Sequence, residues 1–127
     1  MTEQAMRQRL AEAMGWTDLQ DVSPCGRMQG LWGTEPAGWF CSGSAAREGI
    51  IAPDPLESDR DAALLRAWCV GRHWDVQSYA DYAHAECSTG VGDGPRAEVD
   101  HTEEPDPCRR ERLALCQAVL QALEVQP

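Results

Sequence analysis

Residues 106–123 read DPCRRERLALCQAVLQAL, and this stretch decides the fold more clearly than any other part of the chain. Asp106 suits a helix N-cap, because its carboxylate can accept hydrogen bonds from the free N–H groups of the first turn, and Pro107 fits the first helical position. The apolar residues that follow recur at helical spacing, namely Leu113, Cys116, Val119, Leu120 and Leu123. The stretch therefore predicts a helix from about residue 107 to 124 that buries one face against a sheet.

Two further helices precede this one. Thr2 can cap a first helix whose apolar side chains Met6, Leu10 and Met14 recur every four residues, with Gly15 placed to end it. Ser58 and Asp61 have the spacing of a capping box. They open a second helix that ends near Gly71, with its apolar face made by Leu64, Leu65, Trp68 and Cys69.

The segments between the helices have the patterns of strands. From residue 21 to 55 short apolar pieces alternate with Gly, Pro and Ser, which predicts short strands and ordered loops around Leu31-Trp32, Trp39–Cys41 and Ile50–Ala52. From residue 73 to 102 the period is close to two, which predicts a three-stranded antiparallel meander. Gly90, Gly92 and Gly94 then form a hairpin loop within it.

Together these elements predict one domain over residues 1–127, a size that can bury a core without disulfides. The fold class is α+β, with an antiparallel sheet, made of the three-stranded meander plus the short strands, sandwiched by three helices.

The charged residues exclude several functions. All 11 positive charges are arginines and the chain has no lysine, so a Walker-type phosphate loop, a kinase lysine and a Schiff-base nucleophile are ruled out. The net charge of −10 disfavours extended nucleic acid as a partner, because that affinity comes mainly from cations that neutralise phosphates. A small anionic ligand stays open, because a local arginine cluster can bind one.

Six cysteines are spread widely, several of them within apolar patterns, and we interpret them as reduced and mostly buried. No stretch has the roughly 20 apolar residues of a membrane span, and the N-terminus lacks the order of a signal peptide, so we expect a cytoplasmic protein without a membrane partner.

The sequence contains only weak signals for a metal site and for a catalytic site. Cys69, His73, His84 and Cys87 have spacings close to those of zinc ligands. The first pair spans a helix end, and His84 and Cys87 point to opposite faces of a strand, so we expect these elements not to converge and predict no metal. No nucleophile-and-base motif is present, which predicts a protein that is not an enzyme and needs no cofactor.

A cluster of three arginines, Arg109, Arg110 and Arg112, opens the last helix. Positive charge is unfavourable there unless something anionic compensates it. One hypothesis is local ion pairing with the acidic run Glu103, Glu104 and Asp106; the other is phosphate binding at the helix start. Tyr79 and Tyr82 flank the first meander turn, where a base could stack on them. Trp74 alternates with polar residues and is favoured as a core residue.

Four stretches carry a resemblance to a known family: LAEAMGW at 10–16, GLWG at 30–33, IAPD at 51–54 with the helix entry to Ala67-Trp68, and LCQAVLQAL at 115–123. In these the chain resembles the phage ABA-sandwich domain family, small phage proteins of α/β/α architecture. That group is similar to the type I Thoeris anti-defence proteins, oligomeric sponges that bind cyclic ADP-ribose-like and cyclic oligonucleotide signals without cleaving them.

The resemblance implies a ligand site made of arginines near the start of the last helix and an aromatic from the meander. The family often has Arg directly after the cysteine of the last helix, where this chain has Gln117 after Cys116. Arg109, Arg110 or Arg112 would have to take that role.

Two functions are therefore expected. The first is a phage anti-defence sponge that sequesters a small cyclic nucleotide in the cytoplasm of an infected bacterium, working as a homodimer or higher oligomer. Its ligand-binding residues would be Arg109, Arg110, Arg112, Tyr79 and Tyr82. The alternative is a non-catalytic phage accessory protein that binds a host protein through its acidic surface.

Overall fold

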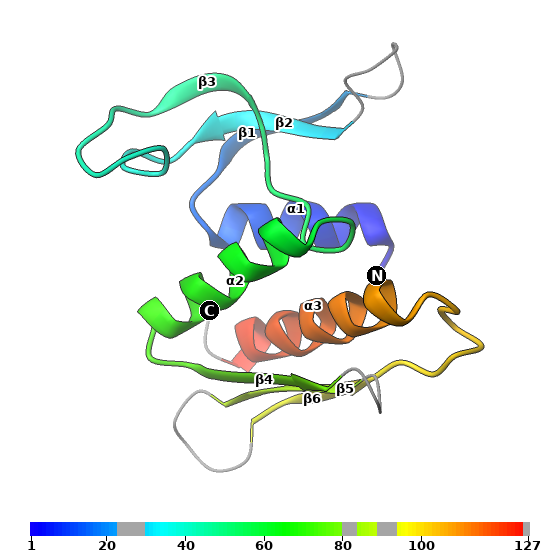
Figure 1. Cartoon of the computed structure of the whole chain (residues 1–127). Coiled ribbons are helices and arrows are strands. Elements are labelled where there is room, and N and C mark those ends of the chain that lie inside the picture. Colours follow the sequence, from blue (N-terminus) through cyan, green and yellow to red (C-terminus); the bar gives the residue numbers. More distant parts are fainter. Residues whose placement is uncertain (23–29, 80–83, 89–93, 126–127) are drawn as a thin grey trace. The chain divides into compact units, whose positions relative to one another are not determined.

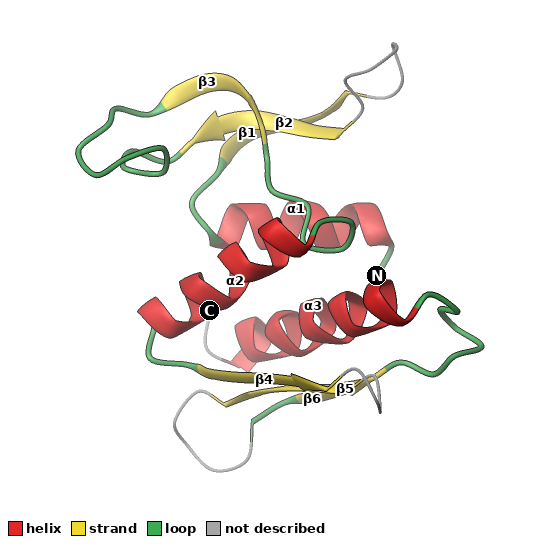
Figure 2. Cartoon of the chain, viewed as in Figure 1, coloured by secondary structure: helices red, strands yellow, loops and turns green. Residues whose placement is uncertain are grey.

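The structure is a computed structural model that describes residues 1–22, 30–79, 84–88 and 94–125. The chain divides into two compact units, residues 1–54 and 55–127, and each is described by itself. The described residues form three helices and two three-stranded antiparallel sheets (Figure 2), so the α+β class and the antiparallel pairing are confirmed. The meander and the short strands were expected to form one sheet, but each forms a sheet of its own. The single domain over residues 1–127 stays a prediction.

The first unit begins with helix α1, Glu3–Ala13. Thr2 caps it as predicted, because its Oγ1 accepts a hydrogen bond from Ala5 N at 3.1 Å. The helix ends where expected: Gly15 has a φ of +100°, a left-handed conformation that glycine adopts without a Cβ penalty. The apolar residues Met6 and Leu10 are buried.

The sheet of this unit has the order β1-β2-β3, with β1 at Thr17–Val22, β2 at Gly30–Glu35 and β3 at Arg47–Ile51. Strands were predicted around Leu31-Trp32 and Ile50–Ala52, and the structure confirms them. The third apolar piece, Trp39–Cys41, instead lies in the turns between β2 and β3, where Trp39 packs edge-on against Trp16 with ring centroids 5.5 Å apart.

An ion pair between a buried carboxylate and a half-exposed guanidinium joins β2 to β3. Glu35 is only 1% exposed, and Arg47 opposite it donates from Nε and Nη2 to the two carboxylate oxygens. This hydrogen bond raises the pKa of Arg47, which also lies 4.4 Å above the ring of Phe40. The pairing is what allows a carboxylate to be buried between strands.

The second unit contains helices α2, Asp59–Gly71, and α3, Pro107–Val125. Ser58 caps α2 as predicted, accepting a hydrogen bond from Asp61 N at 3.2 Å. Asp106 caps α3, because its Oδ1 accepts from Cys108 N at 3.0 Å. In the predicted stripe of α3, Leu113 is only half-buried, whereas the other four residues are buried, namely Cys116, Val119, Leu120 and Leu123.

The meander forms the sheet of this unit, in the order β4-β5-β6. Its strands are β4 at Asp75–Tyr79, β5 at His84–Ser88 and β6 at Arg96–Glu98, all antiparallel as predicted. Helix α3 lies along one face and contacts all three strands, while α2 contacts β4 and α3 (Figure 1). The sheet's inward-facing residues are small, with Ala85, Cys87 and Ala97 buried beneath α3.

Among the described residues, none of the helices is long and apolar enough to cross a membrane.

Candidate functional site

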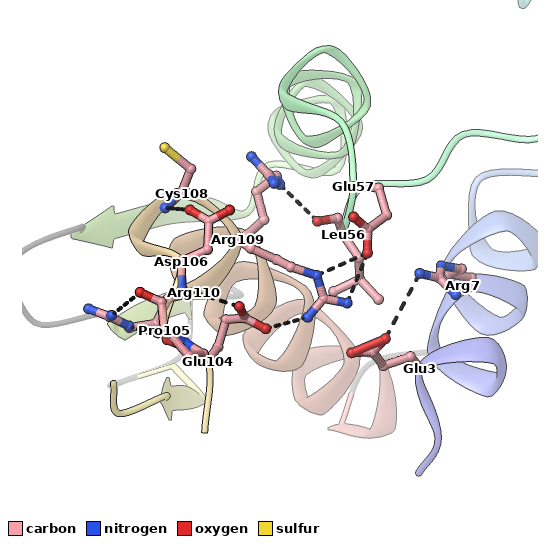
Figure 3. A network of polar contacts seen from close by, with 11 residues as sticks. Glu3, Arg7, Leu56, Glu57, Glu104, Pro105, Asp106, Cys108, Arg109 and Arg110 are labelled. Atoms are coloured by element: carbon pink, nitrogen blue, oxygen red, sulfur yellow. Dashed lines mark hydrogen bonds and ion pairs between the residues drawn. The ribbon is translucent and has the colours of Figure 1, made fainter. Parts of the chain in front are cut away.

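The three arginines of the predicted site lie in the first two turns of α3, and each guanidinium has protein partners. Arg109 is held between two carboxylates (Figure 3). Its Nε donates to Glu57 Oε1 at 2.9 Å, and its Nη1 donates to Glu104 Oε2 at 2.6 Å. The arginine side chain is 18% exposed, whereas that of Glu57 is 48% exposed. The carboxylate of Glu57 is therefore open to solvent, whereas the guanidinium of Arg109 is largely enclosed.

Arg112 fastens α3 to the segment that leads into α2. Its Nε donates to the main-chain oxygen of Leu56 at 2.8 Å, and its Nη1 donates to Asp59 Oδ1 at 2.7 Å. The Arg112 side chain is only 12% exposed, but Asp59 is 85% exposed. The carbonyl bond is thus a structural contact, while the ion pair sits at the surface, where such pairs contribute little.

Arg110 differs from its neighbours in the charge of its partners. Its Nε donates to the carbonyl of Glu104 at 2.8 Å, and its Nη2 donates to the carbonyl of Pro105 at 2.9 Å (Figure 3). Carbonyls satisfy the N–H groups but carry no net charge, so these contacts orient the guanidinium without neutralising it. Of the three arginines, Arg110 is therefore best prepared to attract an anion.

The N-terminus of α3 is capped by a carboxylate of the protein itself, that of Asp106. Asp106 places a carboxylate oxygen on Cys108 N, in the position where a phosphate at a helix start would sit. A ligand phosphate would therefore meet the guanidinium groups on the side of the helix and not the backbone N–H groups at its end.

Local ion pairing was one of two hypotheses for these arginines, and it is confirmed in part. Glu104 pairs with Arg109 as expected, while Asp106 serves as the helix cap. Glu57 and Asp59 were not predicted as partners; they come from 52 and 53 residues away, at the start of α2. No signal in the sequence identifies them, because only the packing of α2 beside α3 makes them neighbours. Phosphate binding stays a prediction.

The predicted aromatic partners are less fully described. Tyr79 is the last residue of β4, paired in register with His84, and its side chain is not described. Tyr82 lies outside the described residues. The juxtaposition of tyrosine and arginine thus stays a prediction. Trp74 is 4% exposed and packs edge-on against Trp68 at 5.6 Å, which confirms it as a core residue.

The four possible zinc ligands are partly brought together. Cys69, in the last turns of α2, and Cys87, in β5, lie near enough that each shifts the pKa of the other, with that of Cys69 raised and that of Cys87 lowered. They are neighbours because β4 follows α2 directly and pairs with β5. His73 is exposed, and the side chain of His84 is not described. In the described part of the chain, no group of three or more His, Cys, Asp or Glu residues could hold a metal, and metal-free folding stays a prediction.

Comparison with known proteins finds no match among protein families, curated proteins or solved structures. The resemblance to the phage ABA-sandwich domain family therefore rests on the four sequence stretches alone.

Proposed function

We propose that this protein binds and sequesters a small cyclic nucleotide signal, a cyclic ADP-ribose isomer or a cyclic oligonucleotide, without cleaving it. In this proposal it is a phage anti-defence sponge in the cytoplasm of an infected bacterium, and the ligand phosphates bind the arginines at the start of α3. The observation that carries the proposal is the environment of Arg110, whose guanidinium is oriented by the neutral carbonyls of Glu104 and Pro105. A planar fork held in this way can bond two phosphate oxygens at once.

The neighbouring arginines support the same site because two of their carboxylate partners are exchangeable. Glu57 and Asp59 are substantially exposed, and ion pairs of that kind contribute only about 0–1 kcal/mol. A phosphate that displaces either carboxylate can accept two hydrogen bonds from one guanidinium, and the displaced carboxylate returns to water at little cost. Glu104 is 16% exposed and keeps its contact with Arg109. The site would thus accept an anion without rearrangement of the helix.

A subunit of 127 residues with 11 cations is small for enclosing a dinucleotide-sized ligand. We therefore expect a homodimer or higher symmetric assembly with the ligand between subunits, in which Tyr79 or Tyr82 stacks on a base.

Calorimetry tests the site. The wild type is titrated with a panel of cyclic nucleotides, and the binding partner is then titrated into Arg109→Ala, Arg110→Ala and Arg112→Ala variants that are checked for folding by circular dichroism. Each lost guanidinium should weaken binding at least tenfold, because a charge-assisted bond contributes about 1.5–3 kcal/mol. Arg96→Ala is the matched control, since it removes an equal charge and an exposed ion pair, that with Glu98, from β6. Unchanged binding in all three variants would contradict these residue roles.

A second candidate is favoured by the carboxylate partners themselves. Because Arg109 and Arg112 are paired with Glu57, Glu104 and Asp59, much of the positive charge is neutralised within the protein, whose net charge is −10. A non-catalytic accessory protein that binds a basic host protein through its acidic surface fits this balance. The absence of binding to every cyclic nucleotide in the panel would favour that function.

A further inference from the structure

Helix α2 has an apolar stripe on the side that faces away from its own sheet and helix α3. The residues that pack against β4 and α3 are buried, namely Ala62, Leu65 and Cys69. On the other side of the helix, Leu64 and Trp68 are only half-buried, and Ala67 and Gly71 are exposed. A Cβ at Gly71 would meet no atom within 4 Å, so the surface beside it is open. An apolar surface with an accessible tryptophan is typical of a protein–protein interface.

Opposite charges lie at the two ends of this stripe. Asp61 is in the first turn of α2, and Arg72 is the residue that caps its end. Four residues follow one another at spacings of three or four and therefore lie on one side of the helix, namely Asp61, Leu64, Trp68 and Arg72. The guanidinium of Arg72 lies 4.9 Å from the ring centroid of Trp68 and 4.6 Å from that of Trp74, which places its charge beside the stripe. The stripe thus runs from a negative end to a positive end.

We propose that this stripe is a self-association surface, on which a second copy of the chain packs its own α2 in the antiparallel direction. The midpoint between the charged residues Asp61 and Arg72 falls between positions 66 and 67. The midpoint between Leu64 and Trp68 falls at position 66. One two-fold axis beside Ala67 therefore brings each aspartate to the partner's arginine and each leucine to the partner's tryptophan. This reciprocity is what a symmetric dimer interface requires.

The distribution of charge favours an antiparallel second copy over a parallel one. A parallel pair would place Asp61 beside Asp61 and Arg72 beside Arg72, and like charges at an interface are strongly unfavourable. The antiparallel pair replaces both repulsions by attractions, and it also brings the opposite ends of the two helix dipoles together. Ala67 and Gly71 are small, so they allow the two helices to approach closely. The surface goes beyond the proposed function, because its complementarity does not depend on a nucleotide.

The size of the stripe predicts a weak dimer. Helix α2 has 13 residues, which corresponds to a length of about 20 Å. A contact of about 20 Å by 10 Å is well below the roughly 800 Å² per partner of a standard interface. We therefore expect a monomer–dimer equilibrium that depends on protein concentration.

Sedimentation equilibrium of the full-length protein without nucleotide tests the proposal, over about 1 µM to 1 mM protein. The average mass should rise from that of one chain toward that of two. Ala67→Glu puts two like charges beside the two-fold axis, so it should raise the dimer Kd at least about tenfold, while glutamate keeps the helix favourable. Ala5→Glu is the matched control, because Ala5 is an exposed alanine of helix α1 and the change in charge is the same. This variant should have the Kd of the wild type.

A charge exchange tests the direction of the two helices. Arg72→Glu should also raise the dimer Kd at least about tenfold, because it turns both symmetric ion pairs into repulsions between carboxylates. The double variant Asp61→Arg with Arg72→Glu restores opposite charges across the axis and should recover most of the lost affinity. A change that acted only by weakening α2 would not be rescued in this way. Circular dichroism checks that each variant is folded.

The proposal is overturned if the wild type is monomeric at every concentration. It is also overturned if the wild type dimerises but Ala67→Glu and Arg72→Glu have an unchanged Kd, because the contact would then lie on another surface. If the exchanged double variant dimerises no better than Arg72→Glu, the antiparallel pairing is wrong. None of these results depends on nucleotide binding, so the failure of this proposal and that of the proposed function are distinguishable.

Discussion

Gly94 lies against the backbone of β5 with no space for a side chain, which makes Gly94→Ala a sharp test of the second unit. A Cβ at this position would lie 2.1 Å from the carbonyl oxygen of Cys87 and 2.5 Å from Ser88 Cα. Both are far inside the usual contact distance of about 3.5–4.0 Å between carbon atoms. The clash is with main-chain atoms, so no side-chain rotation can relieve it. The strand β5 or the entry to β6 must move instead.

The magnitude follows from what that movement breaks. Overpacking costs about 1–3 kcal/mol, and the adjacent hydrogen bond from Cys87 N to the carbonyl of Pro95 contributes about 1 kcal/mol more if it is lost. We therefore expect Gly94→Ala to lower the free energy of unfolding by about 2–4 kcal/mol. In urea this corresponds to a midpoint lower by about 1–2 M, measured by tryptophan fluorescence.

Gly71→Ala is the control for the loss of a glycine as such. Gly71 is the last residue of α2, and a Cβ there would have no atom within 4 Å. Because alanine is the better helix former, its midpoint should equal that of the wild type or exceed it slightly. If Gly94→Ala unfolded at the same urea concentration as the wild type, the packing of Gly94 on β5 would be wrong.

Three other predictions concern a helix cap, an acid-sensitive loop and metal content. Ser58→Ala should lower the free energy of unfolding by about 0.5–2 kcal/mol, because it leaves Asp61 N without its cap; an unchanged urea midpoint would argue against the cap. The hydroxyl of Thr102 and the N–H of Glu103 lower the pKa of Asp100, so its charged form adds stability above the unfolded pKa of about 3.9, and that stability is lost as pH falls through the lower folded pKa. Asp100→Asn should therefore show a flatter fall in stability than the wild type between about pH 4 and pH 2 in acid titrations followed by circular dichroism. Elemental analysis of purified protein should find no stoichiometric zinc, whereas one zinc per chain that is lost in His84→Ala would show a metal site.

The helices were predictable from the sequence because their signals are local. Thr2, Ser58 and Asp106 each mark a helix start within one residue of the observed one, since a cap is a contact over two or three residues. The meander was predictable for a similar reason, because apolar and polar residues alternate within each of its strands. Strand β1 was missed because its sequence TDLQDV has one large apolar residue on each face and reads as a polar loop.

The contacts of the candidate site could be predicted only in part. Glu104 is five residues from Arg109, so its pairing was expected from position alone. Glu57 and Asp59 pair with Arg109 and Arg112 only because α2 packs beside α3, and no short-range pattern encodes that packing. The same holds for Cys69 and Cys87, whose elements were expected to stay apart. Alternation along a strand predicts the face of the sheet on which a residue lies, but it does not predict which helix covers that face.

The proposed binding of an intact cyclic nucleotide is tested most directly by one measurement. The wild type is incubated with a panel of cyclic ADP-ribose isomers and cyclic oligonucleotides, separated from unbound material, and denatured by heat so that bound ligand is released and analysed by mass spectrometry. We predict stoichiometric release of one ligand with its mass and ring unchanged. Release of a linear or otherwise altered product would contradict the claim and indicate an enzyme, and uptake of no ligand would contradict nucleotide binding altogether.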